Sequence, residues 1–139
     1  MTARDLMTRD PITVTPETSI SDVWDLMSEQ DIRHVPVVQD GALVGMLSNR
    51  DLPLSDILRL LSVEGAVVLN RELAMPVSKI MSRDVIFVEP EARASDIVRL
   101  LLEHKIGAIP VIRADTRKVL GIVSYIDVLR AVQNRLDEE

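Results

Sequence analysis

Two serine and aspartate pairs with identical spacing are the residues best suited to bind a ligand. Ser48 and Asp51 are separated by two residues, and so are Ser124 and Asp127. Each pair follows an apolar segment, and in one interpretation it is a capping box that closes the start of a helix. In the other, the carboxylate accepts both hydroxyls of a ribose, while the serine hydroxyl and the helix amides face a phosphate. The spacing alone leaves both interpretations open.

Other reactive residue types are sparse. The sequence has no cysteine, which excludes disulfides and thiolate metal sites. His34 and His104 are the only histidines and lie in different contexts, so no metal site is predicted. The chain has no Gly-x-Ser-x-Gly elbow, no Walker loop and no His-Glu-x-x-His motif. We therefore expect neither catalytic residues nor enzyme activity.

Amino-acid composition further limits the possible classes of protein and of partner. The 139 residues are 47% hydrophobic and 27% charged, which is typical of a globular domain. With 16 basic against 22 acidic side chains the net charge is −6, and only three residues are aromatic, so a nucleic-acid partner is disfavoured. No apolar run reaches the length of a membrane span, and the N-terminus lacks a signal-peptide pattern. We expect a cytoplasmic protein without a membrane partner.

The sequence contains an internal repeat. Residues 6–37 align with residues 80–111 at a shift of 74 positions, with 14 identities in 32 positions. After a two-residue insertion, residues 43–51 align with residues 119–127 at a shift of 76 positions. The insertion falls beside Asp40-Gly41, a hairpin-turn dipeptide where added residues are tolerated. The chain is therefore expected to contain one unit built twice.

Each repeat is predicted to contain an amphipathic helix and a hairpin. Apolar residues recur at helical spacing in both copies: Ile20, Val23, Trp24 and Met27 in the first, and Ala94, Ile97, Val98 and Leu101 in the second. Ser19 can cap the first helix and its counterpart Arg93 cannot, so the first helix should start more sharply. The hairpin strands are predicted at residues 35–38, 43–47, 109–112 and 119–123.

A second helix is expected after each hairpin. In the second copy it spans residues 125–136, with Leu129, Val132 and Leu136 on one side. In the first copy Pro53 interrupts the pattern, so the helix should stop after one turn and restart through residues 55–61.

The remaining segment, residues 62–77, is predicted to be a linker between repeat 1 (residues 1–61) and repeat 2 (residues 78–139). Its apolar residues 66–69 are unsuited to a solvated tether. We expect the linker to pack on the repeats or on a second subunit.

The order of these features resembles the CBS domain, named after cystathionine β-synthase. In both copies a strand after Met-Ser/Thr-x-Asp, a helix, a Pro-Val strand, a hairpin and a Gly-x-x-Ser-x-x-Asp motif follow one another. The resemblance implies an α/β (α+β) fold of two tandem βαββα repeats related by a pseudo-twofold axis, with sheets packed together and helices outside. It also implies a free-standing Bateman-type module, a homodimer, and two clefts that each accept an adenosine ligand.

The resemblance also assigns residues to the two clefts. Adenine would lie among Met7, Thr8, Ile12, Ile32 and Met46 in the first copy, and among Met81, Ser82, Ile86, Ile106 and Ile122 in the second. The alternative for the apolar members is that they are plain core. Ribose and phosphate would contact Asp51 and Ser48 in the first copy, and Asp127 and Ser124 in the second.

The two predicted sites differ in charge. Arg33 and His34 stand where the family often places phosphate-facing residues, whereas the second copy has Gly107 and Ala108. Two unequal sites are predicted, with Arg33 the better phosphate partner. The alternative is an exposed basic pair at the start of a strand.

The function predicted from this resemblance is regulatory. The protein would bind AMP, ADP, ATP or S-adenosylmethionine as a regulatory ligand, with no covalent cofactor, and would modulate a protein partner. The alternative is a dimerisation scaffold whose clefts no longer bind ligand. The sequence names neither the ligand nor the partner.

Overall fold

The chain forms two compact units, and each unit is made of segments that alternate with those of the other along the sequence. In the computed structural model the described residues are 1–52 and 63–139, so the second helix predicted for repeat 1 lies outside them. Unit 1 comprises Met1–Ile12, Asp40–Leu43 and Ile86–Glu139, and unit 2 comprises Thr13–Gln39 and Val44–Val85. Each unit therefore combines most of one repeat with the segment that leads into the other repeat.

Unit 2 begins with the first predicted amphipathic helix, α2 (Ile20–Gln30). The hydroxyl of Ser19 accepts a hydrogen bond from the Asp22 N–H at 3.1 Å, which satisfies a free donor at the helix start. The helix ends because Asp31 adopts the left-handed conformation, with φ of 52°. Arg93 makes no side-chain cap at the equivalent helix, so the predicted difference in capping is confirmed, but the two helices begin at equivalent residues, Ile20 and Ala94.

The next hairpin belongs mostly to unit 2, while its turn and the first two residues of its second strand, Asp40–Leu43, belong to unit 1. Strands β2 (His34–Gln39) and β3 (Ala42–Ser48) are joined by Asp40 and Gly41, whose φ angles of 52° and 80° are those of a type I′ turn. Alternate residues of β3 are buried, as a strand with one face on a core requires. The predicted strands and turn are confirmed, and a single 3-10 turn, η1 (Asn49–Asp51), follows β3.

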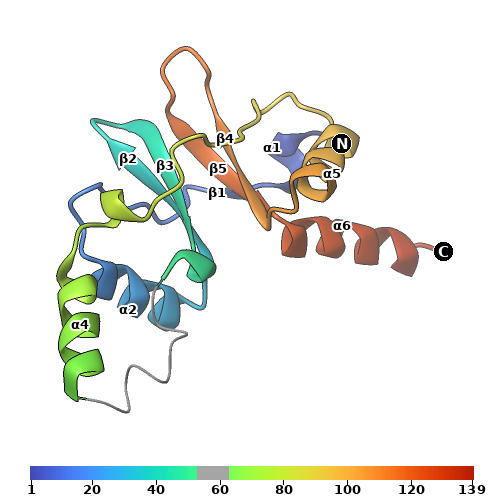
Figure 1. Ribbon diagram of the computed structural model, residues 1–139. Coiled ribbons are helices and arrows are strands. Elements are labelled where there is room, and N and C mark those ends of the chain that lie inside the picture. The colour runs from blue at the N-terminus through green and yellow to red at the C-terminus, as the bar shows by residue number, and fades with distance from the viewer. Residues whose placement is uncertain (53–62) are drawn as a thin grey trace. The chain divides into compact units, whose positions relative to one another are not determined.

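The segment predicted to be a linker contains a helix, α4 (Val63–Ala74), followed by the 3-10 turn η3 (Val77–Lys79). Figure 1 shows α4 alongside α2, and the two helices are in contact. Leu69 and Val77 are buried, but Val67 and Val68 are 46% and 44% exposed, so the expected packing of this apolar segment is confirmed only in part. The core of the unit lies between these helices and the hairpin, with Ile20, Val35 and Leu47 at its centre.

Unit 1 is built around a three-stranded antiparallel sheet in the order β1-β5-β4. The strands are β1 (Thr8–Arg9), β4 (Ala108–Ile112) and β5 (Val119–Ser124), and the helices are α1 (Ala3–Leu6), α5 (Ala94–His104) and α6 (Tyr125–Asp137). Apolar residues of α1, α5 and the sheet share one core. The hairpin and the helix predicted after it are confirmed.

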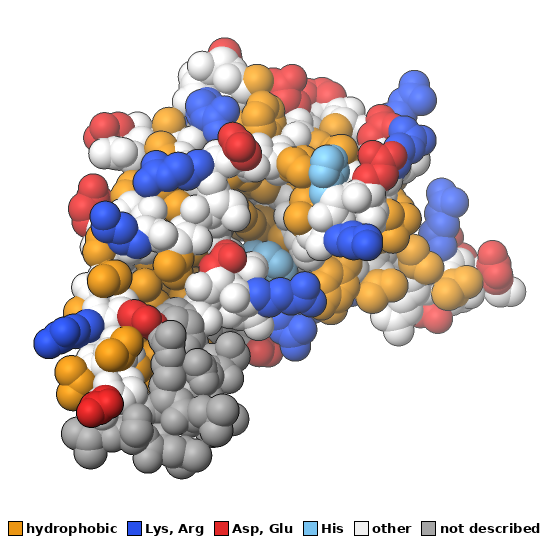
Figure 2. Space-filling view, in the orientation of Figure 1, with side chains coloured by type: hydrophobic (Ala, Val, Ile, Leu, Met, Phe, Trp, Pro, Cys, Tyr) orange, Lys and Arg blue, Asp and Glu red, His pale blue; other side chains and the backbone are white. Residues whose placement is uncertain are grey.

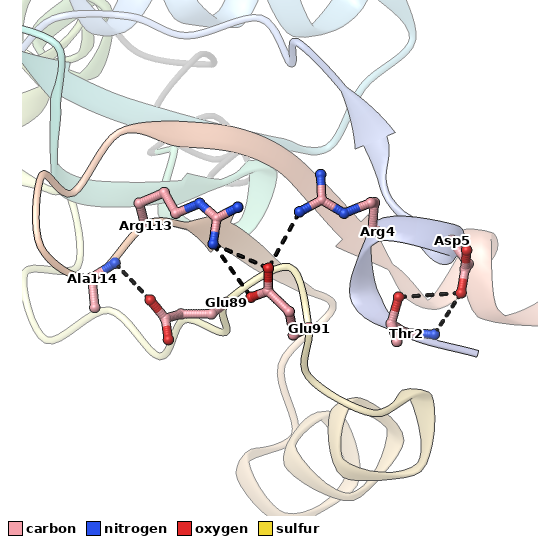
Figure 3. Close-up of polar contacts among 7 residues, drawn as sticks. All are labelled: Thr2, Arg4, Asp5, Glu89, Glu91, Arg113 and Ala114. Carbon is pink, nitrogen blue, oxygen red and sulfur yellow. Dashed lines mark hydrogen bonds and ion pairs between the residues drawn. The ribbon is translucent and has the colours of Figure 1, made fainter.

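Hydrogen bonds and ion pairs fasten the N-terminal segment to the second repeat within unit 1. The carboxylate of Glu91 accepts from Arg113 at 3.1 Å and from Arg4 of α1 at 3.3 Å (Figure 3). The Ala3 N–H donates to the Ala92 carbonyl at 2.8 Å. Ala3 is also fully buried, so α1 contributes to the core as well as to the surface contacts.

Two local predictions were wrong. The first strand was placed after Met-Thr-x-Asp, but β1 is Thr8–Arg9 within that motif, and Val14 makes only an isolated parallel bridge to Val37. Trp24 was placed on the buried face of its helix, but 41% of its surface is exposed. Helical spacing puts Trp24 at the edge of that face, where Ile20, Val23 and Met27 already fill the core.

Candidate ligand-binding sites

Asp127 stands at the start of α6 and uses its two carboxylate oxygens differently. Oδ2 accepts from the Ser124 amide at 2.8 Å and from the Ser124 hydroxyl at 3.1 Å, while the Asp127 amide donates to that hydroxyl at 3.3 Å. These contacts form the capping box. Oδ1 instead accepts from the Thr8 hydroxyl at 3.2 Å. The carboxylate therefore joins the cap to strand β1.

Thr8 reaches Asp127 because β1 pairs with β5. In this pairing Thr8 lies opposite Ile122, and Arg9 lies opposite Gly121. Gly121 is required for the close approach, since a Cβ there would lie 2.5 Å from the Met7 sulfur and 2.9 Å from the Thr8 carbonyl oxygen. The absence of a side chain at Gly121 thus lets Met7 pack closely against the sheet and lets Thr8 lie near the start of α6. We call Met7, Thr8, Ile122, Ser124 and Asp127 the Asp127 site.

Three further predicted residues border the Asp127 site. Ala108 pairs with Ser124 across β4 and β5. The Gly107 carbonyl accepts from the Tyr125 amide at 3.1 Å, which ties the start of β4 to the start of α6. Ile106 is half-buried and packs on the core of unit 1, so its core interpretation is at least partly correct.

Unit 2 repeats this arrangement around Asp51. The Asp51 carboxylate accepts from the Ser48 amide at 2.7 Å. Met46 and Ser82 exchange two backbone hydrogen bonds of 2.9 Å, and a Cβ at Gly45 would lie 2.5 Å from the sulfur of Met81. We call Met46, Ser48, Asp51, Met81 and Ser82 the Asp51 site.

Basic residues border the Asp51 site. The Asn49 amide donates to the Arg33 carbonyl at 2.9 Å, which matches the bond between Tyr125 and Gly107 in unit 1. Burial lowers the pKa of His34, and the positive charges of Arg33 and Arg50 lower it further, against the opposing effect of Asp51. Ile32 is half-buried and packs on the core of unit 2.

Sequence reasoning missed Arg50. It was read only as the variable position of the Ser-x-x-Asp motif. Arg50 lies in the 3-10 turn η1, next to Asp51, and its positive charge contributes to the lowered pKa of His34. Its basic character, set against Ile126 at the equivalent position of the second copy, was the available signal.

The residues that precede the first predicted strand of each repeat, which we call the leading segments (Met7-Thr8 and Met81-Ser82), were predicted to belong to the site of their own repeat. This prediction was wrong. Met7 and Thr8 were grouped with the first copy, but they lie against the hairpin of the second. Met81 and Ser82 were grouped with the second copy, but they lie against the hairpin of the first. Ile12 is partly exposed and Ile86 half-buried, and neither is brought to the site of its own copy by a hydrogen bond or strand pairing among the described residues.

The rest of the described surface is mixed in character. Figure 2 shows basic and acidic side chains interspersed over the visible face, with apolar side chains gathered on α6. Within residues 1–52 and 63–139, no group of three or more His, Asp or Glu side chains could hold a metal ion. None of the described helices is both long and apolar enough to cross a membrane.

Comparison with known proteins identifies the family. The family model of the CBS domain matches residues 3–53 and 77–134, which include both serine and aspartate pairs. The chain therefore belongs to the CBS domain family, as a tandem pair with mixed α/β structure.

Its relatives include proteins of similar length. It is 30% identical to the CBS domain-containing protein YhcV of Bacillus subtilis, over 90% of this chain and 81% of YhcV. The crystal structure of CBSX2 in complex with AMP has a TM-score of 0.78 and 31% identity, over 96% of each chain.

Longer relatives match over part of their length. The structure of protein MJ1225 from Methanocaldococcus jannaschii has a TM-score of 0.80 and 29% identity, over 94% of this chain and 47% of MJ1225. Inosine-5′-monophosphate dehydrogenase of Korarchaeum cryptofilum is 30% identical and is matched over 23% of its length.

Proposed function

We propose that the protein is a regulatory module that binds an adenosyl ligand at the Asp127 site and at the Asp51 site and modulates a protein partner. The ligand class comprises AMP, ADP, ATP and S-adenosylmethionine. No catalytic role is assigned to any residue, and the proposed place of action is the cytoplasm, where these ligands are made.

One observation carries the proposal: the same polar and apolar arrangement is built twice. In each unit an aspartate is held through a backbone amide, next to a methionine seated on a glycine. In unit 1 the outer oxygen Oδ1 of Asp127 faces a hydroxyl, that of Thr8. A carboxylate oxygen that accepts from a threonine hydroxyl at 3.2 Å can accept equally from a ribose hydroxyl.

The apolar neighbours suit a purine. Met7 and Ile122 are half-buried beside Asp127, and Met46 is half-buried beside Asp51. Flat apolar walls and strand-edge backbone groups are the surroundings that hold a purine ring. The relation to CBSX2, which was crystallised with AMP, supports the same ligand class for this chain.

Isothermal titration calorimetry of the full chain with AMP, ADP, ATP and S-adenosylmethionine tests the proposal. At least one ligand is expected to bind, and Asp127→Asn is expected to weaken or remove one class of site. Asp96→Asn is the matched control, because Asp96 is an exposed carboxylate in the first turn of α5. Equal affinity in the parent and Asp127→Asn would remove Asp127 from the site, and absence of binding by all four ligands would refute the function.

An exposed apolar face on α6 favours a second function, self-association. Tyr125, Leu129, Val132 and Leu136 recur at helical spacing, and between 41% and 60% of each is exposed. A face of this kind is unusual on a monomer and suits a second copy of the same helix. If the protein is only a dimerisation scaffold, it will associate without any response to nucleotide.

A further inference from the structure

We infer that the two sites differ in the number of ribose hydroxyls that they accept: the Asp127 site takes one, and the Asp51 site takes both. This inference rests on the proposed function and adds a specificity for the sugar of the ligand. It names Thr8 as the residue that determines this specificity, because the Thr8 hydroxyl already occupies one acceptor position of Asp127. The Asp127 site therefore tolerates an adenosyl ligand that lacks one ribose hydroxyl.

The acceptor positions of the Asp127 carboxylate are mostly occupied within unit 1. An ionised carboxylate has about four lone-pair positions, shared equally by its two oxygens. The amide and the hydroxyl of Ser124 take the positions of Oδ2, at 2.8 Å and 3.1 Å. The hydroxyl of Thr8 takes one position of Oδ1, at 3.2 Å. A single position remains, on Oδ1, so a ribose can place only one of its two neighbouring hydroxyls on this carboxylate.

The backbone and the shape of the side chain both hold the Thr8 hydroxyl beside Asp127. Thr8 lies opposite Ile122 in the pairing of β1 with β5, and β5 ends at Ser124, the residue that caps α6. Threonine is branched at Cβ, which restricts its χ1 angle and leaves its hydroxyl few alternative directions. A donor fixed by the fold loses little entropy when it bonds, so the ligand does not displace it easily.

The Asp51 carboxylate has more open acceptor positions. Its Oδ2 accepts from the Ser48 amide at 2.7 Å, and no other hydrogen bond to this carboxylate occurs within the described part of the chain. Ser82 is the counterpart of Thr8, because it bridges to β3 as Thr8 pairs with β5. Serine has no methyl group on Cβ, so the Ser82 hydroxyl is less restricted in direction. Asp51 thus keeps acceptor positions for both ribose hydroxyls.

The number of open acceptor positions decides how a site responds to the loss of a ribose hydroxyl. A hydroxyl that donates to a carboxylate contributes about tenfold to affinity, which is the effect of one hydrogen bond to a charged group. A hydroxyl that finds no acceptor in the site gains nothing over its hydrogen bonds to water. One of the two hydroxyls is therefore dispensable at the Asp127 site, whereas both contribute at the Asp51 site.

Titration calorimetry of single-site variants tests the inference, with AMP, 2′-deoxy-AMP and 3′-deoxy-AMP as the probes. Asp51→Asn leaves the Asp127 site, where one of the two deoxy analogues is expected to bind as tightly as AMP and the other about tenfold more weakly. Asp127→Asn leaves the Asp51 site, where both analogues are expected to bind about tenfold more weakly than AMP.

Thr8→Val, made in the Asp51→Asn background, tests the named residue. Valine keeps the branched shape that suits a strand and removes the hydroxyl donor. The variant is expected to bind AMP about tenfold more tightly than its background, because the freed position of Asp127 accepts the second ribose hydroxyl. Damage to the fold cannot produce this gain in affinity. Thr116→Val is the control and is expected to change nothing, since Thr116 is exposed and lies beyond the end of β5 opposite to Ser124.

The outcomes separate this inference from the proposed function. If both deoxy analogues bind the Asp127 site more weakly than AMP, or one binds the Asp51 site as tightly as AMP, the difference between the sites is overturned and adenosyl binding stands. A Thr8→Val variant that binds AMP no more tightly than its background overturns the role of Thr8. If AMP does not bind the parent protein, the inference fails, and titration with S-adenosylmethionine then decides whether the proposed function survives.

Discussion

At the scale of single residues, the two carboxylate oxygens of Asp127 have different partners. Oδ2 closes the start of α6 through Ser124, and Oδ1 faces Thr8 of β1. The sequence left a capping box and a ligand site as alternatives; the capping box is present, and the proposed ligand contact would use the other oxygen, Oδ1. Under the proposed function, stability measurements report on Oδ2 and ligand titrations report on Oδ1.

Removal of the serine hydroxyl tests the structural role. Ser124→Ala removes the acceptor of the Asp127 amide, so the free energy of unfolding is expected to fall by about 1 kcal/mol. Urea unfolding followed by circular dichroism measures it. Ser95→Ala, at an exposed position in the first turn of α5, is the control and is expected to change little. Equal effects of the two substitutions would show that the cap contributes no stability.

His34 should make stability depend on pH. Its pKa is lowered in the folded state, mainly by burial, so the unfolded chain takes up a proton first as the pH falls. The contribution of His34 is complete above its unfolded pKa, and it is lost as the pH falls from there to the folded pKa. His34→Gln is therefore expected to flatten the fall in unfolding free energy between pH 7 and pH 5, measured by urea titration at each pH.

The control for this pH dependence is His104→Gln, since His104 is exposed at the end of α5. The His104 variant is expected to retain the slope of the parent. Identical slopes for the parent and the His34 variant would contradict the burial of a neutral ring at this position.

At the scale of elements, the contact between a glycine and a methionine aligns each leading segment with its strand. A Cβ at Gly121 would lie 2.9 Å from a backbone oxygen, which cannot move as a side chain can. Gly121→Ala is thus expected to displace β1, to lower the free energy of unfolding by about 1–3 kcal/mol and to weaken binding at the Asp127 site.

Gly45→Ala is the corresponding substitution in unit 2, and it is expected to weaken binding at the Asp51 site instead. Titration of each glycine variant with AMP, 2′-deoxy-AMP and 3′-deoxy-AMP measures which site is lost. If Gly121→Ala left both sites at the affinity of the parent, the positioning of Thr8 by this contact would be disproved.

Most elements could be predicted from sequence because their patterns are local. Helical spacing located α2, α5 and α6, and the Asp40-Gly41 turn located the first hairpin. Helix α4 was missed because Gly65, Val67 and Val68 are weak helix formers, so the segment resembled an apolar linker. Its packing against α2, which is a tertiary contact, stabilises the helix.

At the scale of the whole molecule, the pairing of leading segments with hairpins could not be predicted. Met7-Thr8 and Met81-Ser82 are alike, and each hairpin presents a glycine to receive a methionine. Each segment could pair with either hairpin and make the same contact between its methionine and a glycine. The choice depends on chain connectivity and on contacts such as that of Ala3 with Ala92, between residues far apart in sequence. Both candidate sites were therefore found as residue types, but not as assembled sets.

The apolar face of α6 predicts self-association. Leu129→Lys places a charge in the middle of this face and is expected to shift the protein to the monomer, because an unpaired charge is costly to bury in an apolar contact. Light scattering at several protein concentrations measures the mass. Asn134→Lys, on another exposed side of α6, is the control. A parent that is monomeric at every concentration would contradict the prediction.

The pairing of Met7-Thr8 with the hairpin of the second repeat also has a consequence for biosynthesis. The residues of unit 2 all lie between 13 and 85, so its core can close while translation continues. Thr8 of unit 1 is synthesised 119 positions before its hydrogen-bond partner Asp127. Thr8 therefore remains without this partner until Asp127 has been synthesised, and unit 1 is expected to mature after unit 2.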